Sequence, residues 1–345
     1  MKTDPGQAGA RNAEAQPMVS VVVPTYNAGD WLERCLAGLT ASDWPALEII
    51  VIDDASPTQA AREAAERHGV RYLRLDRNSG PAVARNHGVE AAAGDLIMTV
   101  DADVVVHPDT VRKGVEVLLA APEVGAVFGS YDEHPGHPAF LSQYRNLYHR
   151  WVHQQGDSEA STFWTGCGLV RRQAFDAAGG FGRAYDRPSI EDIEFGYRLR
   201  DQGWKIRLRK DMNCTHLKDW GLVDMVRTDI FRRGVPWMAL LLRRGKDEAA
   251  LNTNPRAKIA TVAAAALVPV LLAAVFWPPL LWLGLLLVGL IVALQWGFYR
   301  EIARLKGIAF AFAVVPAQVL FFLCCAAAIP LGYLRYLSER RSATA

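Results

Sequence analysis

The sequence has few cysteines and no tract of basic residues. No two of its five cysteines have C-x-x-C spacing: Cys35, Cys167, Cys214, Cys324 and Cys325. This pattern excludes a disulfide framework and a cysteine-rich zinc site, and it suits a reducing compartment. With a net charge of +2 and no basic tract, the chain is not expected to bind nucleic acid.

An apolar h-region is missing from residues 1–17, which read MKTDPGQAGARNAEAQP. We therefore expect no secretory signal peptide and interpret this polar stretch as a disordered tail. The domain that follows is expected to remain in the cytoplasm, at the inner face of the plasma membrane.

Charged residues are also scarce between residues 258 and 337, where three apolar segments occur, at 258–277, 280–298 and 308–334. Each is long enough to cross a bilayer, which predicts a multi-pass transmembrane region of about three helices. Residues 220–257 are amphipathic and are expected to lie in the membrane interface. Residues 338–345 form a short tail.

Basic residues set the expected orientation of these segments. Arg243, Arg244 and Lys246 precede the first segment, which places the preceding domain inside. Three crossings would then put Arg335, Arg340 and Arg341 outside, against the same rule. Either one segment is re-entrant or the tail violates the charge bias.

Residues 18–219 alternate between buried-strand and helix patterns. The runs VSVVVPT, LEIIVIDD, VRYLRL and DLIMTV predict strands, each followed by a helical pattern, whereas WKIRL and MNCTHL predict two short strands near the end. This order predicts an α/β domain with a mostly parallel, Rossmann-like sheet and helices on both faces. Ligands of such sheets bind beyond the carboxyl ends of the strands.

Two carboxylates, Asp101 and Asp103, follow the fourth strand directly. With one residue between them, strand periodicity would point both side chains the same way. Paired carboxylates suit Mg²⁺ or Mn²⁺ shared with phosphate oxygens, whereas zinc prefers His and Cys. The alternative is a solvated loop that holds two acids by chance.

Five short motifs occur in one order along this domain: VSVVVPTYN, VIDDAS, NSGPAVARN, TVDAD and IED. As an ordered set over residues 19–217 they resemble glycosyltransferase family 2. The resemblance implies a GT-A fold, a nucleotide-sugar donor, Mn²⁺ or Mg²⁺ as cofactor, and inversion at the anomeric carbon.

The resemblance also implies roles for the residues of the donor site. Pro24 and Tyr26 would pack on the nucleobase, Asp54 would hydrogen-bond the base, and Arg85 would lie near the nucleotide. Asp101 would lie near the ribose and the metal.

A second group of roles concerns the metal and the acceptor. Asp103 would bind the metal directly and His216 would be a third ligand, although a lone histidine after a strand can equally be structural. Asp192 would be the catalytic base, with the neighbouring Glu191 as competitor. Gly166 would line the acceptor channel and Trp164 would stack on a sugar, unless they belong to a bulged strand and the core.

The sequence therefore predicts an inverting, metal-dependent transferase that moves a sugar from a UDP- or GDP-linked donor to a membrane lipid or lipid-linked glycan. A processive polysaccharide synthase is the alternative, but RRGVPW at residues 232–237 only partly matches the Q-x-x-R-W pattern of such enzymes. A silent scaffold would lack Asp103 or Asp192, and a nucleotidyltransferase would carry a glycine-rich basic loop after the first strand. The oligomeric state is not predicted.

Overall fold

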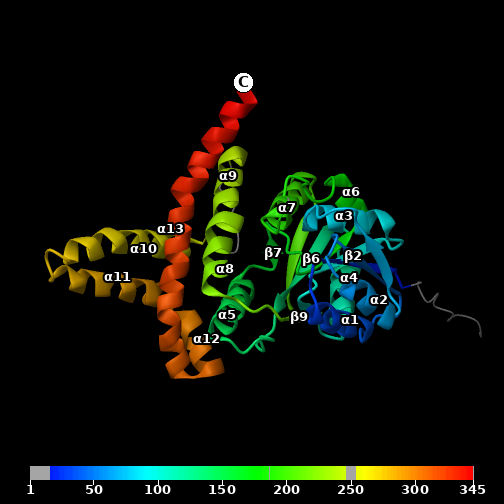
Figure 1. Cartoon of the computed structure of the whole chain (residues 1–345), viewed down its shortest axis with the longest axis horizontal. Coiled ribbons are helices and arrows are strands. Elements are labelled where there is room, and N and C mark those ends of the chain that lie inside the picture. The colour runs from blue at the N-terminus through cyan, green and yellow to red at the C-terminus, as the bar shows by residue number, and fades with distance from the viewer. Residues whose placement is uncertain (1–15, 186, 246–253, 345) are drawn as a thin grey trace, which may run out of the picture.

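The computed structural model describes residues 16–185, 187–245 and 254–344. An α/β domain forms the first part of the chain and a group of long helices follows it (Figure 1). The tail expected at residues 1–17 lies almost entirely outside the described residues, as does the stretch 246–253 of the expected amphipathic segment.

One mixed sheet of nine strands forms the core of the domain, in the order β3-β2-β1-β4-β8-β6-β9-β5, with β7 paired to β9. The half made of β3, β2, β1 and β4 is parallel, as the alternating pattern predicts. Strand β8 is antiparallel to both β4 and β6, so the second half is mixed. The strands are β1 (Val19–Thr25), β2 (Leu47–Asp53), β3 (Arg71–Arg74), β4 (Leu96–Val100), β5 (Val104–Val106), β6 (Val124–Tyr131), β7 (Glu159–Ala160), β8 (Cys167–Arg171) and β9 (Lys205–His216).

Helices cover the sheet, which explains why all seven residues of β1 are buried. On α3, Gly88 lets the helix approach β1 so closely that a Cβ there would overlap Val22. This close approach holds α3, which carries Arg85, against the sheet. The helices of the domain are α1 (Asp30–Thr40), α2 (Ala60–Arg67), α3 (Pro81–Ala91), α4 (Thr110–Ala120), α5 (Phe140–Gln155), α6 (Arg172–Ala177) and α7 (Glu191–Asp201).

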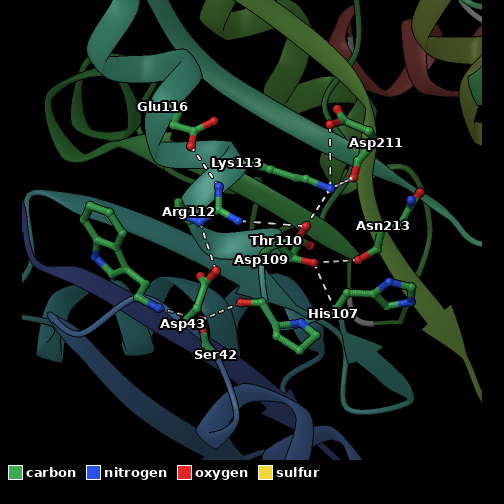
Figure 2. A network of polar contacts seen from close by, with 12 residues as sticks. Ser42, Asp43, His107, Asp109, Thr110, Arg112, Lys113, Glu116, Asp211 and Asn213 are labelled. Carbon is green, nitrogen blue, oxygen red and sulfur yellow. Dashed lines mark hydrogen bonds and ion pairs between the residues drawn. The ribbon is translucent and has the colours of Figure 1, made fainter.

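A polar network fastens α4 to its surroundings (Figure 2). Arg112 binds Asp43 in the loop after α1 at 2.9 Å, and Lys113 lies 3.6 Å from Asp211 on β9. The Thr110 hydroxyl donates to the carbonyl of Asn213 at 2.6 Å. None of these residues lines the large pocket described below, so the network serves the fold.

Strand β4 ends at the fully buried Val100, where the chain leaves the core. Asp101 and Asp103 do not continue the strand alternation that the sequence predicts. They lie in a turn to β5, closed by the Val104 N–H, which donates to the Asp101 carbonyl at 2.9 Å. The turn nevertheless directs both residues to the same pocket.

The prediction of two short strands, WKIRL and MNCTHL, is wrong, because both belong to the twelve-residue strand β9. Its partner β6 shifts register between Phe128 and Ser130. A Cβ at Gly129 would overlap the carbonyl of Met212, so glycine permits this close crossing. The partly exposed run Arg209-Lys210-Asp211 in mid-strand gives the sequence the pattern of a loop.

In the described parts of residues 220–344, seven helical elements follow the domain. The predicted amphipathic segment forms one continuous helical run of α8, the π-helix η1 and α9, and α10 to α13 come after it. Two of these helices, α10 and α13, are long and apolar enough to cross a membrane, and α11 with α12 would add a third only as a bent pair. Their bounds are α8 (Leu222–Arg227), η1 (Thr228–Gly234), α9 (Val235–Arg244), α10 (Pro255–Ala274), α11 (Leu280–Leu294), α12 (Trp296–Lys306) and α13 (Ile308–Thr344).

The second apolar segment is not the continuous helix predicted over residues 280–298. Helix α11 ends at Leu294, and α12 departs at an angle of 74°. The bend follows from packing, because Phe298 is buried against α5 and Gly297 lies under the ring of Trp151. At 15 residues α11 is about 22 Å long, shorter than the roughly 30 Å core of a bilayer.

Helix α13 packs closely along η1 and α9. A Cβ at Gly332 of α13 would clash with Met238 of α9, and one at Gly234 would clash with Ala328 of α13. Small residues thus set the separation of the two helices.

We expect Gly332→Leu to force these helices apart and to lower the free energy of unfolding by about 1–3 kcal/mol, the usual cost of overpacking. Gly289→Leu is the matched control, because a Cβ at Gly289 meets no atom within 4 Å. Thermal unfolding of the purified protein in detergent measures both. Equal midpoints for the two variants would contradict the close packing.

Candidate active site

A pocket of about 710 Å³ lies beyond the carboxyl ends of β1, β2 and β4, where ligands of α/β sheets bind. Side chains reach it from the strand ends and also from α3, α5, α7 and η1. Of the residues predicted to act in catalysis or binding, all except Gly166 line it: Pro24, Tyr26, Asp54, Arg85, Asp101, Asp103, Trp164, Glu191, Asp192 and His216.

Gly166 serves the pocket indirectly. The ring of Trp164 lies against its Cα, so that a Cβ would clash with the indole. Trp164 is 8% exposed and forms edge-to-face contacts with Tyr131 at 4.9 Å between ring centroids. The glycine therefore sets the position of a pocket-lining indole, and Gly166 itself is not among the residues that line this pocket.

At the end predicted to hold the nucleotide, Asp54 is buried and organises the loop before α3. Its Oδ1 accepts the backbone N–H of Ser79 at 2.7 Å and its Oδ2 accepts that of Gly80 at 2.8 Å. Burial raises the pKa of Asp54 above its ordinary value, despite these two hydrogen bonds. Tyr26, by contrast, is 54% exposed and free to pack on a planar ligand.

Arg85 joins two parts of the pocket that lie far apart in the sequence. Its guanidinium binds Asp101 at 2.5 Å and Glu191 at 3.0 Å, and its side chain is only 4% exposed. Burial opposes its charge, but the two carboxylates outweigh that effect and raise the pKa of Arg85 above its ordinary value. Arg85 therefore neutralises both acids and fixes the end of β4 against the start of α7.

This pairing also separates the two candidates for the base. Glu191 is 3% exposed and engaged by Arg85 and by the backbone N–H of Ser189. Asp192 is half-buried, lines the pocket and has no ion pair within the described residues. Burial first, and then the charge of Glu191, raise the pKa of Asp192 to about 7, while Arg233 opposes the shift. A carboxylate with this pKa is suited to take up a proton near neutral pH.

Asn146 on α5 determines how His216 faces the pocket. The Oδ1 atom of Asn146 lies 2.6 Å from His216 Nδ1, and an amide oxygen only accepts, so Nδ1 carries a proton. Tyr131 stacks on the imidazole, with 4.7 Å between centroids and 8° between planes. The opposite nitrogen, Nε2, lies 3.3 Å from Asp103 Oδ2, longer than the about 2.7–2.9 Å of a charge-assisted hydrogen bond.

Asp103 and His216 together provide a carboxylate oxygen and an imidazole nitrogen, a donor pair that suits Mn²⁺. A metal-binding histidine usually donates a hydrogen bond from its other ring nitrogen, as Nδ1 of His216 does here to Asn146. Across the part of the chain that the structure describes, no group of three or more His, Cys, Asp and Glu side chains is arranged so that it could hold a metal ion. Asp101 is held by Arg85 instead, so the remaining ligands of a cation here would be water and phosphate oxygens.

Three pocket residues on α5 escape prediction from the sequence: Arg145, Asn146 and His149. Arg145 forms a buried, bidentate ion pair with Asp229 of η1. Burial lowers the pKa of His149 well below its ordinary value and keeps the ring neutral. Positions i, i+1 and i+4 lie on one face of a helix, and this shared face is the only sign in the sequence that the three residues act together.

The π-helix η1 also contributes side chains that sequence reasoning placed only loosely. Arg232 and Arg233 both line the pocket. Arg232 pairs with Asp224 at 3.2 Å, whereas Arg233 has no ion pair in the described ranges. The Ser189 hydroxyl, three residues before Asp192, donates to the carbonyl of Arg232 at 2.6 Å. This bond fastens the start of α7 to η1.

Removing the Arg85 cation would leave Asp101 and Glu191 uncompensated. We expect Arg85→Met to lower the free energy of unfolding by about 3 kcal/mol, as for other broken buried pairs. Arg62→Met is the control, because Arg62 makes an exposed pair with Glu66 worth less than about 1 kcal/mol. Thermal unfolding in detergent measures the difference, and equal stability of the two variants would contradict the bridging role.

Comparisons with known proteins show which family the sequence of this domain resembles. The model of the family described as glycosyl transferase family 2 matches residues 20–179. The uncharacterized glycosyltransferase YibD of Escherichia coli is 42% identical over 93 residues, 26% of this chain and 27% of YibD. The succinoglycan biosynthesis protein ExoO of Rhizobium meliloti is 39% identical over 107 residues, 30% of this chain and 31% of ExoO. The chain thus spans about a third or less of these relatives.

A solved structure extends the likeness to the fold. The mannosyltransferase PcManGT of Pyrobaculum calidifontis, in complex with GDP-Man and Mn²⁺, matches with a TM-score of 0.58 at 19% identity. The match covers 94% of this chain and 88% of that chain. The expected fold class is confirmed, with a mixed, mostly parallel sheet, surrounding helices and long apolar helices after it.

Proposed function

Residues 20–179 of the chain belong to glycosyltransferase family 2, and on this premise we propose that the protein transfers a sugar from a nucleotide-diphosphate donor to a membrane-associated acceptor. The reaction is inverting and depends on Mn²⁺ or Mg²⁺. The observation that carries the proposal is one pocket that joins a candidate base, Asp192, with the donor pair Asp103 and His216.

The donor lies along the strand ends. Tyr26 and Pro24 pack on the nucleobase, and Asp54 shapes the adjoining loop and accepts from the base. Arg85 and Asp101 adjoin the ribose and the phosphates. Asp103 and His216 would hold the cation, which would neutralise the charge of the departing diphosphate when bound. UDP and GDP donors both fit this description.

Asp192 acts on the acceptor. Its carboxylate takes the proton of the acceptor hydroxyl while the oxygen forms a bond to the anomeric carbon and the bond from that carbon to the diphosphate breaks. Attack opposite the leaving group inverts the anomeric centre. Trp164 and His149 line the acceptor side, where a flat indole face suits a sugar ring.

The acceptor is a lipid or a lipid-linked glycan at the cytoplasmic face of the plasma membrane. Support comes from η1, which lines the pocket and packs on the apolar helix α13. We assign catalysis to residues 18–219 and membrane contact to residues 220–337. A processive synthase is the second candidate, favoured by Arg233, which faces the pocket from the RRGVPW stretch.

Nucleotide release from purified membranes tests the function. UDP- and GDP-sugars are screened with Mn²⁺, with Mg²⁺ and with EDTA. We expect one donor to give release that EDTA abolishes. Asp192→Asn should lower the rate by about 10²–10⁴-fold because the base is lost. Asp103→Asn should abolish the dependence on metal together with the activity.

Asp76→Asn serves as the control, because Asp76 is exposed and does not line the pocket. It should retain the full rate. Failure of every nucleotide to bind would overturn the enzyme assignment and favour a silent scaffold. Polymer longer than one added sugar would favour the processive synthase.

The pH dependence of kcat/KM tests the identity of the base. Asp192 must be ionised, and its pKa is about 7, so kcat/KM should rise through pH 7 and lie about tenfold below its plateau at pH 6. Arg233 lowers the pKa of Asp192, so Arg233→Gln should move the rising limb of the kcat/KM profile to higher pH. Arg232→Gln is the control, since Arg232 pairs with Asp224. An unchanged limb in Arg233→Gln would argue against Asp192 as the base.

A further inference from the structure

Helix α13 satisfies the length of a membrane span, yet its contacts do not fit a crossing. We propose that α13 lies along the membrane surface on the side of the α/β domain, so that the C-terminal end of α13 remains on that same side. A single helical hairpin, α10 with α11, then enters the bilayer and returns. This inference does not depend on the reaction proposed above.

The first part of α13 packs on the α/β domain itself. Phe310 contacts Phe140 with 5.1 Å between ring centroids, and Phe321 contacts Tyr148 at 5.0 Å. Between them, the Tyr144 hydroxyl donates to Gln318 at 3.0 Å. Phe140, Tyr144 and Tyr148 belong to α5, whose other side chains line the pocket.

The last part of α13 packs on elements that are fastened to the same domain. Glu339 binds Arg243 of α9 at 2.5 Å. Helix α9 in turn contacts α7, because the Trp237 indole N–H donates to the Tyr197 hydroxyl at 3.1 Å and Arg244 binds Asp201 at 2.8 Å. Both ends of α13 are therefore connected to the α/β domain, the first part directly through α5 and the last part through α9 and α7.

A crossing between these two contacts would place them on opposite sides of the hydrocarbon core. Phe310 and Glu339 are 29 positions apart, which is about 44 Å along a helix and exceeds the roughly 30 Å hydrocarbon core. A helix that crossed from the domain side would carry α9 and its ion pairs with Asp201 and Glu339 into the bilayer or beyond it. Charged pairs of this kind belong in water or at the interface.

The hairpin is the part that leads away from the domain (Figure 1). Its base packs on the middle of α13, where Phe322 contacts Ala260 and Ile291. Its tip is exposed and aromatic, with Phe276 89%, Trp277 61% and Trp282 72% exposed. Figure 1 shows the α/β domain and the hairpin on opposite sides of α13. Membrane lipid is the occupant that fits this exposed apolar tip.

The lipid-facing side of α13 is apolar in the same way. Its exposed large apolar residues are Ile308, Phe312, Ile329, Leu331, Tyr333 and Leu334.

The distribution of basic residues supports the same arrangement. If α13 does not cross, Arg335, Arg340 and Arg341 lie on the side of Arg300, Arg304 and Lys306. All six basic residues then lie on the cytoplasmic side, as the positive-inside rule expects. Three crossings would instead have placed the basic residues at the end of α13 outside.

Cysteine labelling of the full chain tests the proposal. Ser342→Cys and Ser338→Cys place thiols at exposed positions near the end of α13, and Asp76→Cys places one on the α/β domain. Cells are treated with a membrane-impermeant maleimide before and after permeabilisation. The unaltered chain measures background labelling, which should be low because four of its five cysteines are buried. An unchanged midpoint of thermal unfolding in detergent, compared with the unaltered chain, confirms that each variant is folded.

We expect all three variants to become labelled only after permeabilisation. Labelling of Ser342→Cys and Ser338→Cys in intact cells, with Asp76→Cys protected, would establish a crossing and overturn the proposal. Labelling of all three in intact cells would keep α13 on the domain side but overturn the cytoplasmic orientation given under the proposed function.

Discussion

The buried guanidinium of Arg85 is the interaction on which the pocket depends. It holds Asp101, at the end of β4, and Glu191, at the start of α7, in one salt-bridge network. Because Glu191 is committed to Arg85, its neighbour Asp192 remains the acid without an ion pair in the described chain. One cation thus divides three neighbouring carboxylates into two that organise the site and one that is available for proton transfer.

Much of this arrangement could be predicted because it follows from strand order. Parallel strands end at one edge of a sheet, so the polar residues that follow β1, β2 and β4 had to meet there. Asp54, Asp101 and Asp103 accordingly line one pocket. The apolar runs that predict β1 and β4 are buried throughout, as expected for strands covered on both faces.

The parts that could not be predicted depend on contacts between distant segments. The bend after Leu294 exists because Phe298 finds a buried position against α5, which no local pattern records. Strand β9 continues through a partly exposed charged run because Gly129 lets the chain cross β6 closely. Asn146 acquires its role only from the imidazole of His216, which follows it by 70 positions. In each case the local sequence is compatible with several structures and the tertiary contact selects one.

Helix α5 connects the chemistry to the membrane. Arg145, Asn146 and His149 face the pocket, while Tyr144 and Tyr148 on the same helix contact α13. Under the proposed function, the wall of the acceptor side is therefore one helix away from the surface proposed to meet lipid. An acceptor whose lipid part stays in the membrane would then need to extend only its head group into the pocket. The ion pair of Arg145 with Asp229 fastens α5 to η1, and both of these helices also pack on α13.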